Sequence, residues 1–200
     1  MIKLHFAPLT RSIRVRWLLE ELNVPYELVK TEYNRDGSRG FAQDTPSGNY
    51  PYIEDGNVSL SESGAIVQYI LERYGSGRLE PLIGSKDRAP YLFWLHFAEG
   101  TAASSINTTV WLTVYRQDAD RHQDLISAVR GSANTVFDKV EAALSTQSFI
   151  AGNELTAADI MMGFTLGSAK WLQMLTDTHP KTLDYVDRLF ARPALHKSLG

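Results

Sequence analysis

The stretch Ser61-Glu62-Ser63 places a carboxylate between two hydroxyls, immediately before an apolar segment with helical periodicity. The first turn of a helix carries unpaired N–H groups and the positive end of the helix dipole, so Ser63 at that position would attract a carboxylate. Glu62 beside it would attract an ammonium group. Together the two suit a free amino acid in its zwitterionic form. The alternative is plain capping of the helix by Ser61 or Ser63, which explains the serines but not Glu62.

A second polar stretch, Thr10-Arg11-Ser12, precedes another helical pattern. A hydroxyl near a helix start can donate a hydrogen bond to an anion, and Arg11 would add positive potential. Such a hydroxyl cannot act as a base at pH 7, so its role would be that of a donor. Here too the alternative is that Thr10 or Ser12 is only the N-cap of the helix.

The composition is that of an ordinary globular chain, with 200 residues of which 44% are hydrophobic and 22% charged. The net charge is −3 and the basic residues are not clustered, so the pattern of a nucleic-acid-binding protein is missing. No run is long enough to span a bilayer, and nothing marks export, so we expect a cytoplasmic protein with no membrane partner. The chain has no cysteine, which excludes disulfides, thiolate metal sites and a cysteine nucleophile. The five histidines have no metal-ligand spacing, and no metal is expected.

The elements that must position these residues begin with a strand, a helix and a strand. Residues 2–6 and 26–30 have the pattern of short strands, and residues 12–22 repeat apolar side chains at helical spacing. Such a βαβ unit has parallel strands and a right-handed crossover. The polar residues 31–50 predict a loop that includes at most a short irregular helix.

A hairpin is predicted next, over residues 52–60 with Asp55-Gly56 at its turn. A helix with apolar residues at helical spacing follows and ends at Gly75. The order strand, helix, strand, connection, two strands, helix is that of a thioredoxin-like domain.

The second part of the chain follows a linker-like, glycine-containing segment and shows no strand pattern. Its predicted helices are residues 86–117, 121–146, 156–176 and 181–191. The first of them is long enough to predict a kink near Gly100. The expected fold class is therefore an α/β thioredoxin-like N-terminal domain plus an all-α C-terminal domain. The expected boundaries are residues 1–78 for the first domain, 79–85 for the linker and 86–200 for the helical domain.

Four segments, in this order and over nearly the whole chain, resemble the glutathione transferase family, with its cytosolic bacterial and fungal members as the nearest type. They are APLTRSIRVRWLLEEL, TPSGNYPYIEDG, LSESGAIVQYI and FIAGNELTAADI. The last segment contains Thr156-Ala-Ala-Asp159, a variant of the capping box in which a threonine begins a helix and an acid reaches back to it. We assign this set to folding and not to chemistry.

The resemblance implies that Pro51 is a cis-proline, which would turn the backbone of Tyr50 toward an extended peptide for antiparallel pairing. The residues alone favour a trans proline on an edge strand. The resemblance also implies that the peptide is glutathione, with its γ-glutamyl end on Glu62 and Ser63. The candidates for binding its glycyl carboxylate are Asn49, Gln43, Arg39 and Arg11.

The residue that would hold the glutathione thiolate departs from two common family patterns. Tyrosine-type members carry a tyrosine after the first strand, where this chain has Phe6, and cysteine-type members need a cysteine. Serine-type members place their donor four residues before the arginine of the first helix. Counting back from Arg14 gives Thr10 as the expected catalytic residue, with Ser12 as its rival.

The second substrate is expected to be a small hydrophobic electrophile, bound between the domains. The candidate contacts are Leu9, Ser105, Thr108 and Trp111. For the three residues of the helical domain, a place in the core or in a dimer interface is an equally good explanation.

The resemblance thus implies a homodimeric glutathione transferase that conjugates the thiolate of its co-substrate glutathione to a hydrophobic electrophile in detoxification. Two alternatives remain open. One is a glutathione-dependent peroxidase or reductase, and the other is a non-catalytic glutathione-binding module.

Overall fold

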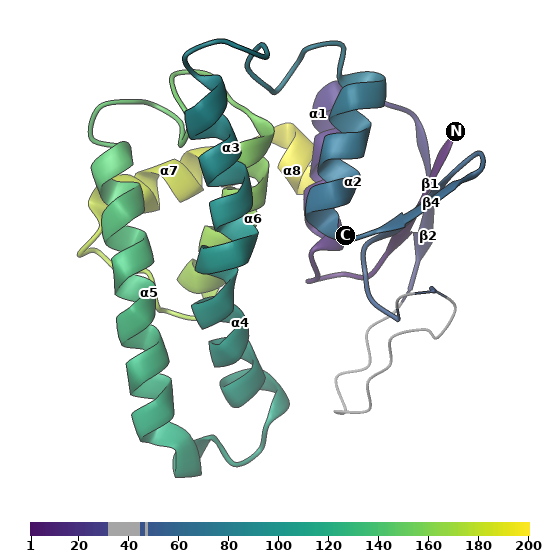
Figure 1. The fold of residues 1–200 in the computed structure, drawn as a ribbon. Coiled ribbons are helices and arrows are strands. Elements are labelled where there is room, and N and C mark those ends of the chain that lie inside the picture. Colours follow the sequence, from purple (N-terminus) through teal and green to yellow (C-terminus); the bar gives the residue numbers. More distant parts are fainter. Residues whose placement is uncertain (32–44, 47) are drawn as a thin grey trace. The chain divides into compact units, whose positions relative to one another are not determined.

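The computed structural model describes residues 1–31, 45–46 and 48–200, which form two compact units (Figure 1). The first unit comprises Met1–Glu80 together with Phe190–Gly200, and the second comprises Pro81–Leu189. Residues 190–200 thus pack with the N-terminal strands and helices. The domain boundaries given above stay a prediction, and most of the predicted loop 31–50 lies outside the described residues.

The first unit is built on a four-stranded mixed sheet with the strand order β2-β1-β3-β4. Its strands are β1 (Ile2–Phe6), β2 (Tyr26–Lys30), β3 (Tyr52–Asp55) and β4 (Val58–Ser61). The strands β1 and β2 are parallel and are joined by α1 (Ser12–Leu22), whereas β3 is antiparallel to both β1 and β4. The predicted βαβ unit and hairpin, and with them the thioredoxin-like fold class, are confirmed.

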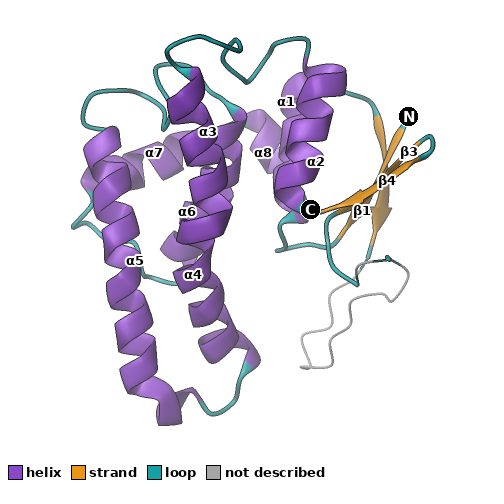
Figure 2. Ribbon diagram, viewed as in Figure 1, coloured by secondary structure: helices purple, strands orange, loops and turns teal. Residues whose placement is uncertain are grey.

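Two helices lie side by side on one face of this sheet, α1 and α2 (Ser63–Ile70) (Figure 2). The alternating pattern of β1 explains the arrangement, because Ile2, Leu4 and Phe6 are buried while the residues between them are partly exposed. A π-helical turn, η1 (Leu71–Gly75), continues α2 to the predicted end at Gly75.

A short helix that the sequence did not predict, α8 (Pro193–Ser198), packs on α1. Arg192 donates two hydrogen bonds to the carboxylate of Glu21, at 2.6 and 2.8 Å. The indole N–H of Trp17 donates to the same carboxylate at 2.9 Å. These bonds outweigh the effect of burial and hold the pKa of Glu21 below its ordinary value.

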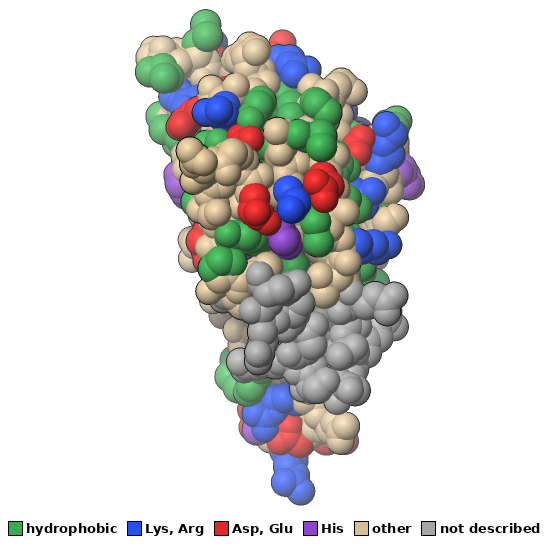
Figure 3. Space-filling model, turned by 90° about the vertical axis from the view of Figure 1, so that its right-hand side faces the viewer, with side chains coloured by type: hydrophobic (Ala, Val, Ile, Leu, Met, Phe, Trp, Pro, Cys, Tyr) green, Lys and Arg blue, Asp and Glu red, His purple; other side chains and the backbone are tan. Residues whose placement is uncertain are grey.

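The opposite side of β1 carries polar side chains. His5 Nε2 lies 2.6 Å from Glu54 Oε1 on the neighbouring strand, and its ring meets Tyr52 edge-on. Figure 3 looks onto the strand side of the first unit, where acidic, basic and apolar side chains alternate over the part not drawn in grey. Charges of both signs therefore share this described surface.

The hairpin differs from the prediction by one residue at its turn. The two turn residues are Gly56 and Asn57, and Gly56 has a φ of 63° that suits glycine. Asp55 belongs to β3, where it pairs with Val58 of β4. Its side chain is buried and accepts hydrogen bonds from the hydroxyls of Tyr69 and Tyr74. The bond from Tyr74, more than any other contact, lowers the pKa of Asp55.

The named elements of the second unit, among its described residues, are all helices. The long predicted helix is divided into α3 (Arg88–Phe97), η2 (Ala98–Ala102), α4 (Ala103–Val110) and η3 (Trp111–Tyr115). The segments η2 and η3 are π-helical, and η2 contains Gly100, so regular α geometry is interrupted where the kink was expected. Within residues 1–31 and 48–200, no helix is both long enough and apolar enough to cross a membrane.

The remaining helices of this unit are η4 (Ala119–His122), α5 (Gln123–Ala143), α6 (Ala157–Trp171) and α7 (Pro180–Phe190). Asp159, in the first turn of α6, is fully buried and accepts hydrogen bonds from the backbone N–H groups of Ile150 at 2.8 Å and Thr156 at 2.7 Å. It also accepts from the hydroxyl of Tyr185, at 2.7 Å. The acid of the predicted capping box therefore fixes both a turn and a neighbouring helix.

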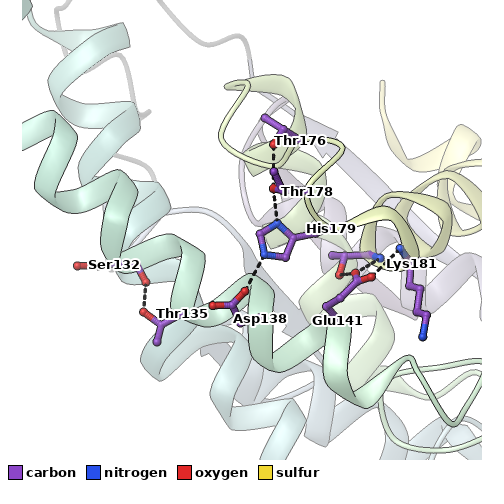
Figure 4. A network of polar contacts seen from close by, with 9 residues as sticks. Ser132, Thr135, Asp138, Glu141, Thr176, Thr178, His179 and Lys181 are labelled. Carbon is purple, nitrogen blue, oxygen red and sulfur yellow. Dashed lines mark hydrogen bonds and ion pairs between the residues drawn. The ribbon is translucent and has the colours of Figure 1, made fainter.

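The N-terminus of α7 is held by α5 in a similar way (Figure 4). Glu141 accepts from the backbone N–H groups of Lys181 at 3.0 Å and Thr182 at 2.8 Å, and from the Thr182 hydroxyl at 2.7 Å. Burial alone would raise the pKa of Glu141, but these hydrogen bonds outweigh it and the net shift is downward. One turn earlier on α5, Asp138 lies 3.0 Å from the buried His179 ring.

Candidate functional site

The candidate site begins where β1 ends and the chain turns toward α1. Leu9 in this turn has a φ of 61°, a left-handed conformation that is uncommon for a bulky residue and costs of order 1–3 kcal/mol. Its side chain is 70% exposed. The loop therefore holds an apolar side chain in solvent directly before Thr10.

The two predicted hydroxyls lie in contact, with Thr10 Oγ1 2.7 Å from Ser12 Oγ. Thr10 Oγ1 also donates to the carbonyl of Ala7 at 2.7 Å. Neither residue is the N-cap of α1, because that position belongs to Arg11, whose side chain makes no capping hydrogen bond. Ser12 is 0% exposed, whereas Thr10 retains accessible surface, so Thr10 is the hydroxyl that a ligand could reach.

The second part of the site is the start of α2. Glu62 is its N-cap residue, is exposed, and has a φ of 71° and a ψ of 110°, again a left-handed φ that a non-glycine residue rarely adopts. Ser63 is the first helical residue and is buried. As at α1, the N-cap side chain makes no capping hydrogen bond to its own helix.

A buried arginine joins the two helix starts, and the sequence reasoning gave it no part in the site. Arg14 is 1% exposed, and its guanidinium donates to Ser63 Oγ at 3.1 Å. The bond uses a lone pair of the serine oxygen and leaves the hydroxyl proton for another acceptor. A signal was present in the sequence, since Arg14 stands four residues before Leu18 and eight before Leu22, on the buried stripe of α1.

The residues around the predicted cis-proline are described in part. The Tyr50–Pro51 peptide bond is cis, which confirms the prediction. The Tyr50 hydroxyl donates to Thr31 Oγ1 at 2.9 Å, and the Asn49 carbonyl accepts from the Thr45 hydroxyl at 3.3 Å. Gln43 and Arg39, the other candidates for the glycyl carboxylate, lie outside the described residues.

The electrostatics of this site follow from the two adjacent helix N-termini. The starts of α1 and α2 are linked through Arg14 and Ser63, and Arg11 adds a second cation. Glu62 is the acidic side chain at these two starts, since neither helix has an acid in its first turn. The arrangement suits a ligand that presents a carboxylate to the helix N-terminus and an ammonium to Glu62.

The comparison with protein families agrees with this geometry. Residues 4–81 match the model of the glutathione S-transferase N-terminal domain, and residues 104–193 match that of the glutathione S-transferase C-terminal domain. The chain belongs to the glutathione transferase family.

Individual members of the family are distant from this one. Glutathione S-transferase 3 of Schizosaccharomyces pombe is 29% identical over 183 residues, which cover 85% of this chain and 75% of that protein. GstB of Escherichia coli is 26% identical over 192 residues, covering 94% and 92%. A glutathione S-transferase structure from Actinobacillus pleuropneumoniae has a TM-score of 0.83 at 27% identity and covers 99% of this chain and 91% of its own. A Phanerochaete chrysosporium transferase, solved with oxidized glutathione, has the same fold, with a TM-score of 0.83 at 23% identity, covering 98% and 92%.

The residues predicted to contact an electrophile in this glutathione transferase family member belong to different units. Leu9 lies in the first unit, and Ser105, Thr108 and Trp111 lie in the second. Trp111 is 49% exposed, and the Arg116 guanidinium lies 4.8 Å from its ring centroid. Ser105 and Thr108 are half-buried on α4. Their role toward an electrophile stays a prediction.

Proposed function

We propose that this member of the family binds glutathione and conjugates its thiolate to a hydrophobic electrophile. The observation that carries the proposal is the start of α2, where the buried Arg14 fixes Ser63 and the exposed Glu62 stands beside it. The γ-glutamyl end of glutathione is an amino-acid zwitterion, which matches a hydroxyl at a helix N-terminus next to a carboxylate.

In this proposal the Ser63 hydroxyl and the first N–H groups of α2 receive the γ-glutamyl carboxylate, while Glu62 receives the ammonium. The backbone of Tyr50, next to Pro51, pairs with the backbone of the bound peptide. Asn49 and Arg11 receive the glycyl carboxylate.

Thr10 is the proposed donor to the glutathione sulfur. A free thiol has a pKa near 8.5, so only a few per cent is the nucleophilic thiolate at pH 7. Lowering that pKa by about 2 units requires about 2.7 kcal/mol of preference for the anion. A hydroxyl beside a helix N-terminus can provide much of this, since it favours the charged form of the sulfur.

The test is a titration of glutathione to saturation, followed by a pH titration of thiolate absorbance in the complex. We expect the parent to bind glutathione and to lower its thiol pKa. Thr10→Val preserves the shape and removes the hydroxyl, so it should reduce turnover by about 10²–10³-fold if Thr10 is the main donor, with affinity nearly unchanged. Thr10→Ser is the matched control and should keep most of the activity.

Each possible result has a distinct meaning. If the parent binds glutathione but gives no rate with any of a panel of electrophiles, the chain is not a transferase; activity with hydroperoxides or disulfides then indicates a peroxidase or reductase, and no activity indicates a binding module. If Thr10→Val titrates like the parent, the thiolate is held by other groups.

We also propose a homodimer, as the family resemblance implies. The electrophile would contact Leu9, Ser105, Thr108 or Trp111. Light scattering tests the first statement, and turnover of Trp111→Ala with aromatic and aliphatic electrophiles tests the second.

A further inference from the structure

The two hydroxyls of the candidate site form a closed ring of hydrogen bonds with Ala7. The Ala7 N–H donates to Ser12 Oγ at 3.3 Å, and Thr10 Oγ1 donates to the Ala7 carbonyl at 2.7 Å. The two hydroxyl oxygens are 2.7 Å apart and close the ring. The backbone N–H of Ser12 also donates to Thr10 Oγ1, at 3.2 Å.

The direction of each proton in this ring is determined by counting donors and acceptors. A carbonyl oxygen can only accept, so the single proton of Thr10 points to Ala7. The proton between the two hydroxyls must then come from Ser12. Ser12 therefore accepts from Ala7 and donates to Thr10, and the Thr10 oxygen accepts twice from Ser12, from its hydroxyl and from its backbone N–H.

This order makes Thr10 a stronger donor than an isolated threonine. If its proton turns from the Ala7 carbonyl to a ligand anion, Thr10 loses one hydrogen bond and keeps both donors to its oxygen. Those donors stabilise the negative charge that builds on the oxygen as its proton is shared with the anion. Hydrogen bonds in such a chain strengthen one another by roughly 10–30% each.

Ser12 itself cannot make the contact, because it is fully buried between Ala7 and Thr10. We propose that Ser12 is a positioning residue that sets the direction of the Thr10 proton and strengthens Thr10 as the donor to the glutathione thiolate. This inference rests on the proposed function, in which Thr10 contacts the sulfur. Ser12 acts on the thiolate only through Thr10.

A purely structural role for Ser12 makes a different prediction. In that case Ser12 only satisfies the buried N–H of Ala7, and its removal lowers the stability of the fold without changing the bound thiol. A double-mutant cycle on the thiol titration separates the two, because it measures the coupling between neighbouring residues.

The experiment compares the parent, Ser12→Ala, Thr10→Val and the double variant, each saturated with glutathione. At a fixed pH, Ser12→Ala should lower the thiolate-to-thiol ratio by about threefold, consistent with the loss of one cooperative bond. Thr10→Val should lower it by roughly tenfold to a hundredfold. In the Thr10→Val background, Ser12→Ala should have no further effect. Ser198→Ala, which removes another fully buried serine hydroxyl of the same unit, should leave the ratio unchanged.

The outcomes are distinguishable. If the parent does not lower the thiol pKa of bound glutathione, the proposed function fails and the inference with it. If the parent does so but Ser12→Ala has no effect, or has the same effect with and without Thr10, the inference alone is overturned.

A measurement on the parent covers the case in which Ser12→Ala fails to fold. In NMR spectra, the Ala7 carbonyl carbon should resonate upfield in the glutathione complex relative to the S-methylglutathione complex. Only the thiolate draws the Thr10 proton away, so only in the glutathione complex does the Ala7 carbonyl lose this hydrogen bond. The Ala7 amide proton should move downfield, because Ser12 then accepts more strongly. Equal Ala7 resonances in the two complexes would overturn the inference.

Discussion

Two helix N-termini in each unit are treated in opposite ways. In the second unit, side-chain carboxylates hydrogen-bond the starts of two helices, Asp159 at α6 and Glu141 at α7. In the first unit, the N-cap side chains of α1 and α2 make no capping bond, and neither helix has an acid in its first turn.

The difference shows how one local feature can serve either folding or binding. An N-terminus closed by a buried carboxylate has its N–H groups satisfied and its dipole compensated, so it contributes to stability. The N-terminus of α2 has no such carboxylate, and its first residue, Ser63, accepts a hydrogen bond from the buried Arg14. This N-terminus therefore retains its attraction for an external anion. Carboxylates in the second unit should therefore affect stability, and Glu62 should affect glutathione binding.

The largest expected effect is that of Asp159→Asn. The change replaces one carboxylate oxygen with an amide NH2, so either Oδ1, which accepts from Ile150 and Tyr185, or Oδ2, which accepts from Thr156, is lost. Buried donors left unsatisfied are destabilising. We expect a loss of about 3 kcal/mol in the free energy of unfolding, measured with urea. Tyr185→Phe, which removes one of these donors, should lose less. A loss under about 1 kcal/mol for Asp159→Asn would contradict the closed-terminus interpretation.

Glu62→Gln should have the next largest effect, on binding and not on folding. It keeps the size of the side chain and removes the charge opposite the γ-glutamyl ammonium, so the Kd for glutathione measured by calorimetry should rise roughly ten- to hundredfold. Glu72→Gln, another exposed acid of the same helical segment, is the matched control and should bind normally. Equal affinities for Glu62→Gln and the parent would remove the basis for the γ-glutamyl assignment.

A smaller effect is expected for Glu141→Gln. The amide oxygen can still accept some of the hydrogen bonds from Lys181 and Thr182, but the charge is lost. The free energy of unfolding should therefore fall by about 1 kcal/mol. Glutathione affinity should not change. Glu154→Gln, at an exposed position of the same unit, provides the comparison. A stability equal to that of the parent would mean that Glu141 is dispensable for α7.

The smallest expected effect is the pH dependence of the stability difference between the parent and Glu141→Gln. Because folding lowers the pKa of Glu141, its contribution to stability is present above the ordinary value of 4.5 and is lost as the pH falls through the folded-state value. The gap in unfolding free energy between the parent and Glu141→Gln should therefore be constant near neutral pH and shrink below about pH 4.5. A gap that widens on acidification would show that the sign of the shift is wrong.

The strands and the first helix could be predicted closely because local patterns determine them. Residues 2–6, 12–22 and 26–30 are the observed β1, α1 and β2, since alternation and helical spacing directly reflect which side chains face the core. The turn was misplaced by one residue because the burial of Asp55 depends on Tyr69 and Tyr74, which lie in the helical segment that follows. The helix α8 was missed because its contacts are with α1, far away in the sequence.

The sequence predicted that Thr10 and Ser12 lie at the start of the first helix and Glu62 and Ser63 at the start of the second, and the structure has them there. Their roles toward a ligand came from the family resemblance and stay a prediction. Their accessibility could not be predicted in the same way, because the burial of Ser12 depends on the loop at Ala7, and the buried Arg14 depends on a tertiary contact with Ser63.

The contact between Arg192 and Glu21 has a consequence for the order of events during protein synthesis. The strands of the first unit and its helices α1 and α2 are translated within the first eighty residues, but α8 of the same unit leaves the ribosome only after the entire helical unit. Until then the carboxylate of Glu21 lacks its partner Arg192. A nascent chain halted before residue 192 would therefore expose this face of α1 to chaperones and proteases, whereas the released chain covers it.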